Sequence, residues 1–323
     1  MMAVAPLPCR LVSSRGPLWP AATDERPHPP PPSHVDWEES WHFDAVAPEG
    51  ALAVSVRVTL RPADGRAWWW AHVVRPGHPV VAVRDHDLDP PRGRALELRG
   101  PGLWVDVTCE EPLDHWSVGL EALGVAFDDP LEAWRDERGD PTPVGLDVGW
   151  ESAGPVCARP EQDGYAQPMA VHGEVLVGRE RLDLDATGWR THTWGVRDWW
   201  GSPWWWAGAH LDDDSALCAS SGDSSRASHP QGGVSAQRTG GGAVMSADRD
   251  QHGGVRSASL TVGDETFDVT PVLPAPVAVT GPGERVTRLD RAACSFRSSA
   301  GRGGWGWAEW SEPTRRRPVS RLR

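Results

Sequence analysis

Hydrophobic and polar residues alternate along much of the chain, which is the pattern of a β-strand with one buried face. The clearest example begins at residue 52, where apolar side chains occupy every second position: Leu52, Val54, Val56, Val58 and Leu60. Residues 62–65 then supply turn-forming Pro, Asp and Gly, and residues 67–74 predict a second strand. The pattern therefore predicts consecutive strands joined by a tight turn.

Short apolar or alternating runs continue to the end of the chain, separated by clusters of Gly, Pro and Asp. They lie at residues 80–83, 95–98, 103–108, 116–127, 171–177, 181–184, 204–211, 216–219, 258–262, 267–272 and 305–310. Only residues 131–138 suggest a helix, and that segment is short. Many short strands at nearly regular spacing are typical of a β-sandwich or β-barrel, so the sequence predicts an all-β protein.

Changes in composition suggest how the chain is divided. Residues 1–35 are of low complexity and end in a run of prolines, which predicts a disordered or loosely docked leader. We expect its deletion to leave stability nearly unchanged, because it buries little apolar surface. Residues 142–164 are rich in Pro and Gly, and here we place the crossing between an N-terminal unit, 36–160, and a C-terminal unit, 161–311. Residues 312–323 form an Arg-rich tail.

Two further segments bear on the two-unit division. Residues 65–71 contain three consecutive tryptophans after a turn, and residues 201–207 repeat that arrangement. This single pair of matches is compatible with two copies of one unit and equally with chance. Residues 220–254 are rich in Ser and Gly, which predicts a long mobile hairpin inserted in the C-terminal unit.

Charge and residue usage exclude several classes of function. The formal net charge is −13, which argues against nucleic acid or an anionic membrane surface as a partner. The chain contains no lysine, so it lacks the lysine of a phosphate-binding loop, a Schiff base or a general base. Because Tyr165 is the only tyrosine, a Tyr/Lys dehydrogenase pair is excluded as well. These absences leave a chemistry that needs no cofactor.

Cysteine usage and hydropathy indicate the compartment. The 5 cysteines are scattered and form no CxxC pair, which is typical of reduced cytoplasmic thiols and not of a disulfide framework or zinc site. The first residues form a poor signal peptide, and no apolar run approaches the ~18 residues of a membrane helix. An acidic run at residues 85–89 resembles a hard-metal loop, but no second cluster completes a ligand set. We therefore predict a cytoplasmic protein with no metal, no cofactor and no integral membrane segment.

Residues 188–200 are the most unusual stretch of the chain. They combine a histidine, two arginines, an aspartate and four tryptophans within thirteen positions. Arg and Asp are rarely buried unless paired, and a buried His or Trp needs a partner for its N–H. Polar groups held among large aromatic side chains are typical of a pocket for an apolar ligand.

This stretch resembles the signature Gly-x-Arg-Asp-His-Ser-Trp-Gly-x-Arg-Asp-Trp of a family related to the carotenoid 1,2-hydratases (hydroxyneurosporene synthases) and to AttH-like proteins. The resemblance extends over residues 37–310 and includes residues 39–43 and 304–310. The chain departs from the signature at Thr191, where Asp is usual, and conservatively at Thr193. The resemblance implies two lipocalin-like antiparallel β-barrels in tandem. It also implies a hydrophobic small molecule as the partner.

His192 and Trp194 are the first candidates for a functional site. They are two residues apart, so on a strand their side chains point to the same face. The carotenoid hydratases resemble this chain in carrying a functional His-x-Trp here, which implies a catalytic role for His192 and a ligand-binding role for Trp194. Arg190, Arg197, Asp198 and Trp199 are the other candidate ligand-binding residues, although Arg197 and Asp198 could equally form an ion pair that holds a barrel closed.

The second group of candidates lies about twenty residues further on. The hydratases carry a functional Tyr-x-Asp downstream, and His210 and Asp212 would take those catalytic places. The alternative is that residues 212–214 form a solvated hairpin tip. If Asp212 shares an apolar cavity with His192, it can protonate a C=C bond while Trp194 stabilises the cation. The resulting hypothesis is a cofactor-independent hydratase, isomerase or cyclase for an isoprenoid or polyketide-type molecule. The alternative is a non-catalytic lipid or terpenoid carrier.

Overall fold

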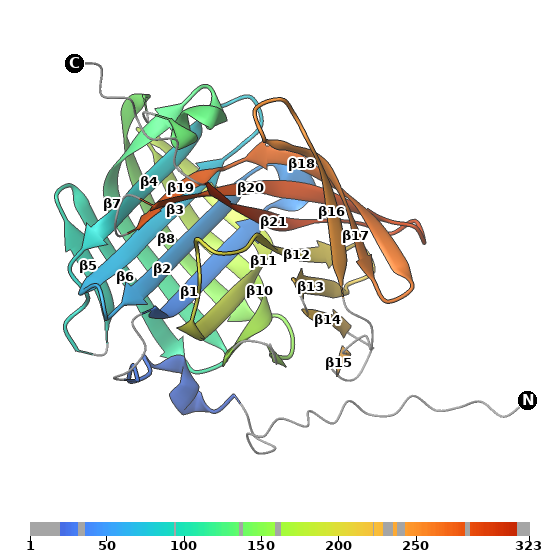
Figure 1. Ribbon diagram of the computed structural model, residues 1–323, viewed down its shortest axis with the longest axis horizontal. Helices are drawn as coiled ribbons and strands as arrows, with labels where there is room; N and C mark the ends of the chain where they lie inside the picture. Colours follow the sequence, from blue (N-terminus) through green and yellow to red (C-terminus); the bar gives the residue numbers. More distant parts are fainter. Residues whose placement is uncertain are drawn as a thin grey trace, which may run out of the picture.

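The computed structural model describes residues 20–31, 36–93, 95–135, 138–158, 163–221, 223–228, 235–237, 243–281 and 285–314. Within these ranges the protein is all-β, with two large antiparallel sheets, as predicted (Figure 1). Three short 3₁₀ turns are the only helical elements described: η1 (Ala22–Glu25), η2 (Pro48–Gly50) and η3 (Pro130–Trp134). The helix expected at residues 131–138 is reduced to η3, and residues 136–137 lie outside the described part. No helix in the described part is long and apolar enough to cross a membrane.

The first sheet contains β1 (Trp37–Val46), β2 (Ala53–Arg61), β3 (Arg66–Val74), β4 (Val80–Leu88), β5 (Leu96–Gly100), β6 (Leu103–Glu111), β7 (His115–Phe127), β8 (Asp140–Ser152), β9 (Cys157–Ala158), β10 (Asp163–Val177) and β11 (Glu180–Val196). The strands follow the order β4-β3-β2-β1-β11-β10-β8-β7-β6-β5. Because β4 also pairs with β7, the sheet closes on itself into a barrel.

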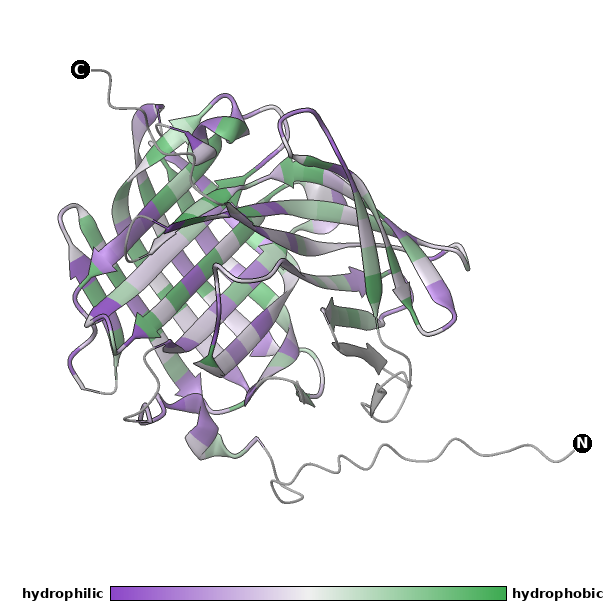
Figure 2. Cartoon of the chain, in the orientation of Figure 1, coloured by the Kyte–Doolittle hydropathy of each residue, from purple (hydrophilic) through white to green (hydrophobic). Residues whose placement is uncertain are grey.

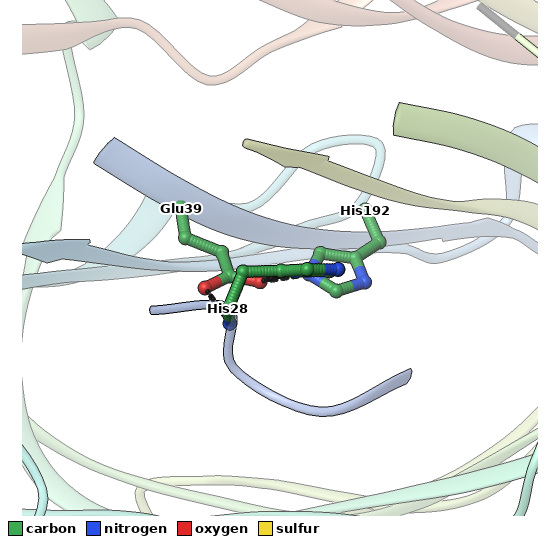
Figure 3. Close-up of side chains that lie close together, drawn as sticks. All are labelled: His28, Glu39 and His192. Atoms are coloured by element: carbon green, nitrogen blue, oxygen red, sulfur yellow. Dashed lines mark hydrogen bonds and ion pairs between the residues drawn. The ribbon is translucent and has the colours of Figure 1, made fainter. Parts of the chain in front are cut away.

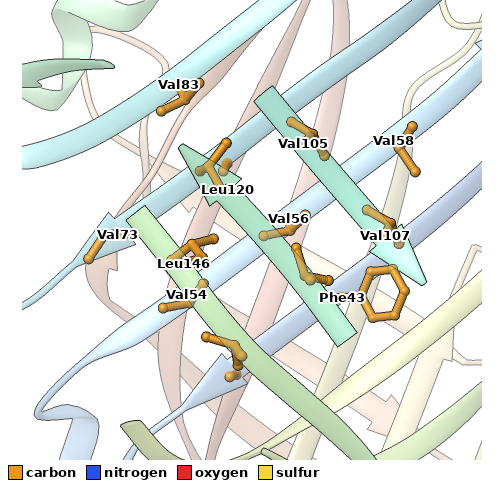
Figure 4. Packing of buried hydrophobic residues seen from close by; sticks show 14 of the residues in the cluster. Phe43, Val54, Val56, Val58, Val73, Val83, Val105, Val107, Leu120 and Leu146 are labelled. Atoms are coloured by element: carbon orange, nitrogen blue, oxygen red, sulfur yellow. The ribbon is translucent and has the colours of Figure 1, made fainter. Parts of the chain in front are cut away.

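The interior of this barrel is the largest apolar cluster of the protein. Hydrophobic and hydrophilic residues alternate along its strands (Figure 2), and the hydrophobic ones form this cluster. Phe43 of β1, Val54, Val56 and Val58 of β2 and Val107 of β6 all belong to this cluster (Figure 4). The alternation of apolar and polar residues that predicted these strands therefore also identifies the residues that face the barrel interior.

The second sheet contains β12 (Trp204–Leu211), β13 (Ala216–Ser220), β14 (Asp223–Ser228), β15 (Ser235–Gln237), β16 (Val244–Arg249), β17 (Val255–Val262), β18 (Glu265–Pro274), β19 (Val277–Gly281), β20 (Arg285–Ser298) and β21 (Gly303–Thr314). It follows the order β15-β14-β13-β12-β21-β20-β18-β17-β16, with β19 paired to β20. Figure 1 shows β20 and β21 crossing the first sheet. Trp307 of β21 donates its indole N–H to the carbonyl of Ala45 at 3.1 Å, which joins the two sheets directly.

Strand β1 is buried on both faces because the second sheet covers the outside of the barrel. Every residue of β1 is buried. Trp41 and Phe43 face the barrel core, whereas His42 faces the second sheet. A strand buried on both sides can carry polar groups on its outer face only if they find partners between the sheets.

The change from the first sheet to the second lies at residues 197–203, and not at 142–164 as the composition suggested. Residues 142–152 belong to β8, and β10 and β11 complete the first sheet by pairing with β8 and β1. The Pro and Gly content gave a wrong boundary because Gly145 and Gly149 lie within paired strands and do not mark a linker. The expected hairpin insertion at 220–254 contains β14, β15 and β16 of the second sheet, and only residues 222, 229–234 and 238–242 of it lie outside the described part.

The leader prediction is wrong for residues 20–31. This segment, which we call the docked leader, buries Glu25 and places His28 against the first sheet. In Figure 1 it lies below the lower ends of the blue and green strands. Residues 1–19, residues 32–35 and the end of the tail, 315–323, lie outside the described part. The Pro-rich composition of the leader gave no indication that one carboxylate within it would be buried.

Candidate functional site

Arg190 is the centre of a polar network inside the first barrel. Its guanidinium binds both carboxylate oxygens of Glu25 at 3.0 Å and donates to Gln167 at 2.7 Å. The hydroxyl of Tyr165 and the indole N–H of Trp116 also donate to Glu25, at 2.6 and 2.7 Å. Glu25 thus supplies the counter-charge that a fully buried arginine requires.

His192 lies beside this network and contacts Glu39. Its Nε2 is 2.8 Å from Oε1 of Glu39, and its Nδ1 is 3.3 Å from the hydroxyl of Tyr165. His28 of the docked leader contacts the same Glu39 oxygen through Nδ1 at 2.7 Å (Figure 3). Trp41 stacks on His192, with ring centroids 4.3 Å apart, and Trp194 stacks on His28 at 3.9 Å.

Burial and hydrogen bonding set the charges of this group. Burial lowers the pKa of His192 in spite of the neighbouring carboxylate, so the imidazole is neutral at physiological pH. Burial alone would raise the pKa of Glu39, but the hydrogen bonds from His192 and His28 outweigh it and lower that pKa. Glu39 is therefore an ionised carboxylate between two imidazoles.

A separate pocket of about 430 Å³ opens between the two sheets. Its first-sheet wall is the outer face of β1, β2 and β11, and its second-sheet wall comes from β12, β13 and β21. The residues lining it are Glu38, His42, Arg57, Asp163, Thr191, Thr193, Trp194, Gly195, Val196, Arg197, Asp198, Ser202, Pro203, Trp204, Trp205, Trp206, Ser220, Ser221 and Glu309. Four tryptophans and several charged groups therefore surround one space.

Glu38 is the carboxyl of this pocket with the most unusual environment. Its Oε2 accepts the indole N–H of Trp199 at 2.6 Å and a guanidinium N–H of Arg61 at 3.2 Å. Its Oε1 is buried and has no hydrogen-bond partner among the described residues, and the Nε of Arg197 lies 3.7 Å from it. Burial raises the pKa of Glu38 although three arginines oppose the shift. A carboxyl in this state keeps a proton to higher pH than an exposed one.

The floor of the pocket is a buried ion-pair network. Glu309 of β21 pairs with Arg57 of β2 at 3.3 Å and with Arg291 of β20 at 2.8 Å, so the network links both sheets. His42 lies 3.7 Å from Glu309 and 3.2 Å from Arg291. This paired carboxylate fixes the position of the two sheets, and it is less suited to proton donation than Glu38.

The structure does not bring the predicted catalytic residues together. His192 is fully buried inside the barrel and does not line the pocket between the sheets. His210 is held in the core by a 2.7 Å hydrogen bond to the carbonyl of Gly188, and burial lowers its pKa to about 4. Asp212 is exposed in the turn after β12, where it accepts the N–H of Gly303 at 3.0 Å. The predicted cavity shared by His192 and Asp212 is therefore absent from the described part of the chain.

The predicted ligand-binding residues divide between the two sites. Trp194 lines the pocket and stacks on His28, so it belongs to both. Arg197 and Asp198 line the pocket, but Arg197 approaches Glu38 and Asp198 accepts the N–H of Trp200 at 3.0 Å, so they do not pair with each other. Trp199 is fully buried beneath the pocket and binds Glu38. Arg190 faces the barrel interior and binds Glu25, away from the pocket between the sheets.

Sequence reasoning missed Glu25, Glu38, Arg57 and Glu309. A signal for Glu38 was present. Residues 38, 40, 42 and 44 are all polar, although Trp41 and Phe43 on the other face are large and apolar. Glu38 and Glu39 also place a carboxylate on each face, which a strand with one solvated face does not explain. Glu309 lies in the second segment of the family resemblance, at 304–310. No local pattern marked Glu25, because its partners come from strands far away in the sequence.

The model of a domain of unknown function, DUF7064, matches residues 21–314. The chain belongs to this family. The DUF7064 match starts within the docked leader, so that segment is part of the domain. No curated protein matches the sequence.

Three solved structures share the fold. A protein from Nitrosomonas europaea whose name places it with AttH is 15% identical, with a TM-score of 0.58 over 86% of this chain and 93% of that one. CghA is 14% identical, with a TM-score of 0.52 over 87% and 89%. Kievitone hydratase from Nectria haematococca is 10% identical, with a TM-score of 0.55 over 84% and 88%. At these identities the likeness establishes the fold and leaves the function to the site.

Proposed function

We propose that this protein is a cofactor-independent hydratase, isomerase or cyclase that acts on an apolar isoprenoid or polyketide-type small molecule in the pocket between the sheets. The observation that carries the proposal is Glu38, a buried carboxyl with a raised pKa beside a wall of tryptophans. Kievitone hydratase shares the fold and is named as a hydratase, which supports hydration as the reaction. The proton donor is thus Glu38, and not Asp212 or His210, and His192 takes no part in the chemistry.

The chemistry of hydration fits these groups. Protonated Glu38 transfers its proton to one carbon of a C=C bond, which leaves a cation on the other carbon. The π-faces of Trp194, Trp204 and Trp206 stabilise that cation by an amount of order 1–2 kcal/mol. Water adds to the cation, and the proton it loses returns to the Glu38 carboxylate. If the cation loses a proton or is attacked by a second double bond, the same first step yields an isomer or a ring.

Thr191 and Thr193 are the groups that would hold the water. Both lie on the outer face of β11 and line the pocket. Thr191 stands where the resembled signature has Asp, so that position offers a hydroxyl here. A hydroxyl can donate a hydrogen bond to a water molecule and also accept one from it, so it can orient the water.

A matched pair of variants tests the proposal. The protein is incubated with prenylated aromatics, linear polyprenyl alkenes and polyenes, and mass spectrometry detects products that gain one water or keep the substrate mass. Glu38→Gln should lower turnover by about 10²–10⁴-fold, because it removes the proton donor, while ligand affinity changes little. Asp212→Asn removes an exposed carboxyl and should leave turnover intact.

The outcomes separate the two candidate functions. Turnover that survives Glu38→Gln would show that another group supplies the proton. A wild-type protein that binds these molecules and transforms none of them would be a carrier.

A further inference from the structure

Three side chains from three separate segments converge on one point at the end of the barrel. His28 comes from the docked leader, Glu39 from β1 and His192 from β11 (Figure 3). One ligand atom of each lies within 4.8 Å of the others. Among the described residues this is the only such group of three His, Cys, Asp or Glu side chains, and residues 85–89 contribute to none.

Hydrogen bonds around His192 fix the orientation of its ring. The hydroxyl of Tyr165 donates to Glu25 at 2.6 Å, and its oxygen lies 3.3 Å from Nδ1 of His192. The other ring nitrogen, Nε2, lies 2.8 Å from Oε1 of Glu39. The ring therefore directs Nε2 at the same carboxylate oxygen that Nδ1 of His28 contacts.

The second ring nitrogen of each histidine lies near a polar group, as is common for histidines that bind a metal. A metal-bound imidazole commonly donates its second N–H to a fixed polar group, which sets the ring orientation. His192 has Tyr165 in that place, and the Nε2 of His28 lies 3.7 Å from a carboxylate oxygen of Asp24. The second oxygen of Glu39 accepts the backbone N–H of His28 at 2.7 Å, which fixes the carboxylate.

We propose that His28, Glu39 and His192 bind a divalent transition-metal ion of the zinc class, which fastens the docked leader to the first sheet. Two imidazoles and one carboxylate form a donor set that zinc accepts, with a fourth position left for water. With metal–ligand bonds of ~2.0–2.2 Å, tetrahedral donor atoms lie about 3.3 Å apart. The two contacts to Glu39 are 2.7 and 2.8 Å, so they need to open by only about half an ångström.

The site differs from the pocket between the sheets in position and role. It lies on the inner face of β1, whereas Glu38 lies on the outer face of the same strand. The proposal departs from our prediction from the sequence that no metal is bound. That prediction considered only local spacing, and His28, Glu39 and His192 are distant from one another in the chain.

Titration calorimetry with zinc chloride on protein stripped by a chelator tests the proposal. We expect one zinc ion per chain, no binding of magnesium, and slower amide exchange in the docked leader when zinc is present. His28→Ala should lower zinc affinity at least about 100-fold. It should leave the fold intact, because His28 lies outside both sheets.

The matched control is His172→Ala. His172 is exposed and pairs with Glu151 at 3.3 Å, so it is a histidine–carboxylate pair without a third ligand. Zinc affinity should be unchanged in this variant. Absence of zinc uptake by the wild-type protein, or equal affinity in His28→Ala and the wild type, would overturn the proposal. Either result leaves the function proposed for Glu38 unaffected.

Discussion

Buried ion pairs recover the free energy lost in desolvation only while both partners are present. Glu25 and Arg190 form such a pair, since both are buried and joined by two hydrogen bonds. Removing Glu25 would leave a guanidinium in the barrel interior with Tyr165 and Gln167 as its remaining neighbours. The stability of the first sheet therefore depends on a residue that precedes its first strand.

Glu25→Ala should lower the free energy of unfolding by about 3–5 kcal/mol, because it leaves a buried charge unpaired. Urea denaturation followed by fluorescence measures the change. Glu180→Ala is the control: Glu180 pairs with Arg75 at the surface, and its loss should cost less than about 1 kcal/mol. Equal effects of the two substitutions would contradict the structural role of Glu25.

His210 should make stability depend on pH in a defined window. Burial lowers its pKa from 6.5 to about 4, so between these values the unfolded chain binds a proton that the folded chain does not. Stability should therefore fall as the pH is lowered from 6.5 to 4, by up to about 3 kcal/mol. Unfolding free energies of the wild type and His210→Asn, measured across this range, should show a smaller slope for the variant. Parallel slopes would indicate that His210 ionises freely in the folded state.

At the scale of elements, the sequence predicted strands well and sheet membership poorly. Alternation located β2, β3 and β7, because each has one face in the barrel core and that face repeats every second residue. It could not show that β10 and β11 complete the first sheet, because pairing depends on strands more than a hundred residues away. The docked leader was missed because it is held by two polar side chains, Glu25 and His28, and not by an apolar pattern.

Deleting residues 1–31 should destabilise the protein at least as much as Glu25→Ala does. The deletion removes the partner of Arg190 and also the contact of His28 with Glu39. The midpoint of thermal unfolding of the truncated protein is compared with that of the full chain. The full chain carrying Asp24→Ala is the control, since Asp24 is only partly buried. A truncated protein as stable as the full chain would mean that the docked leader contributes nothing to folding.

At the scale of the whole molecule, the candidate site arises from the meeting of the two sheets. The sequence identified the stretch 188–200, and seven of its residues line the pocket. It could not supply Arg57 or Glu309, because their association depends on how one sheet crosses the other. His192 and Trp194 share a face as expected, but His192 is fully buried inside the barrel and only Trp194 reaches the pocket.

The double burial of β1 has a consequence for how this family can vary. Ordinary strands such as β7 expose part of one face, and substitutions there are tolerated. In β1 every position touches either the barrel core or the second sheet, so none is neutral. Insertion or loss of one residue would move Glu39 to the pocket face and Glu38 to the barrel face. Among related sequences, the segment 37–46 should therefore show few non-conservative substitutions and no insertions or deletions, while the turns on either side can vary in sequence and length.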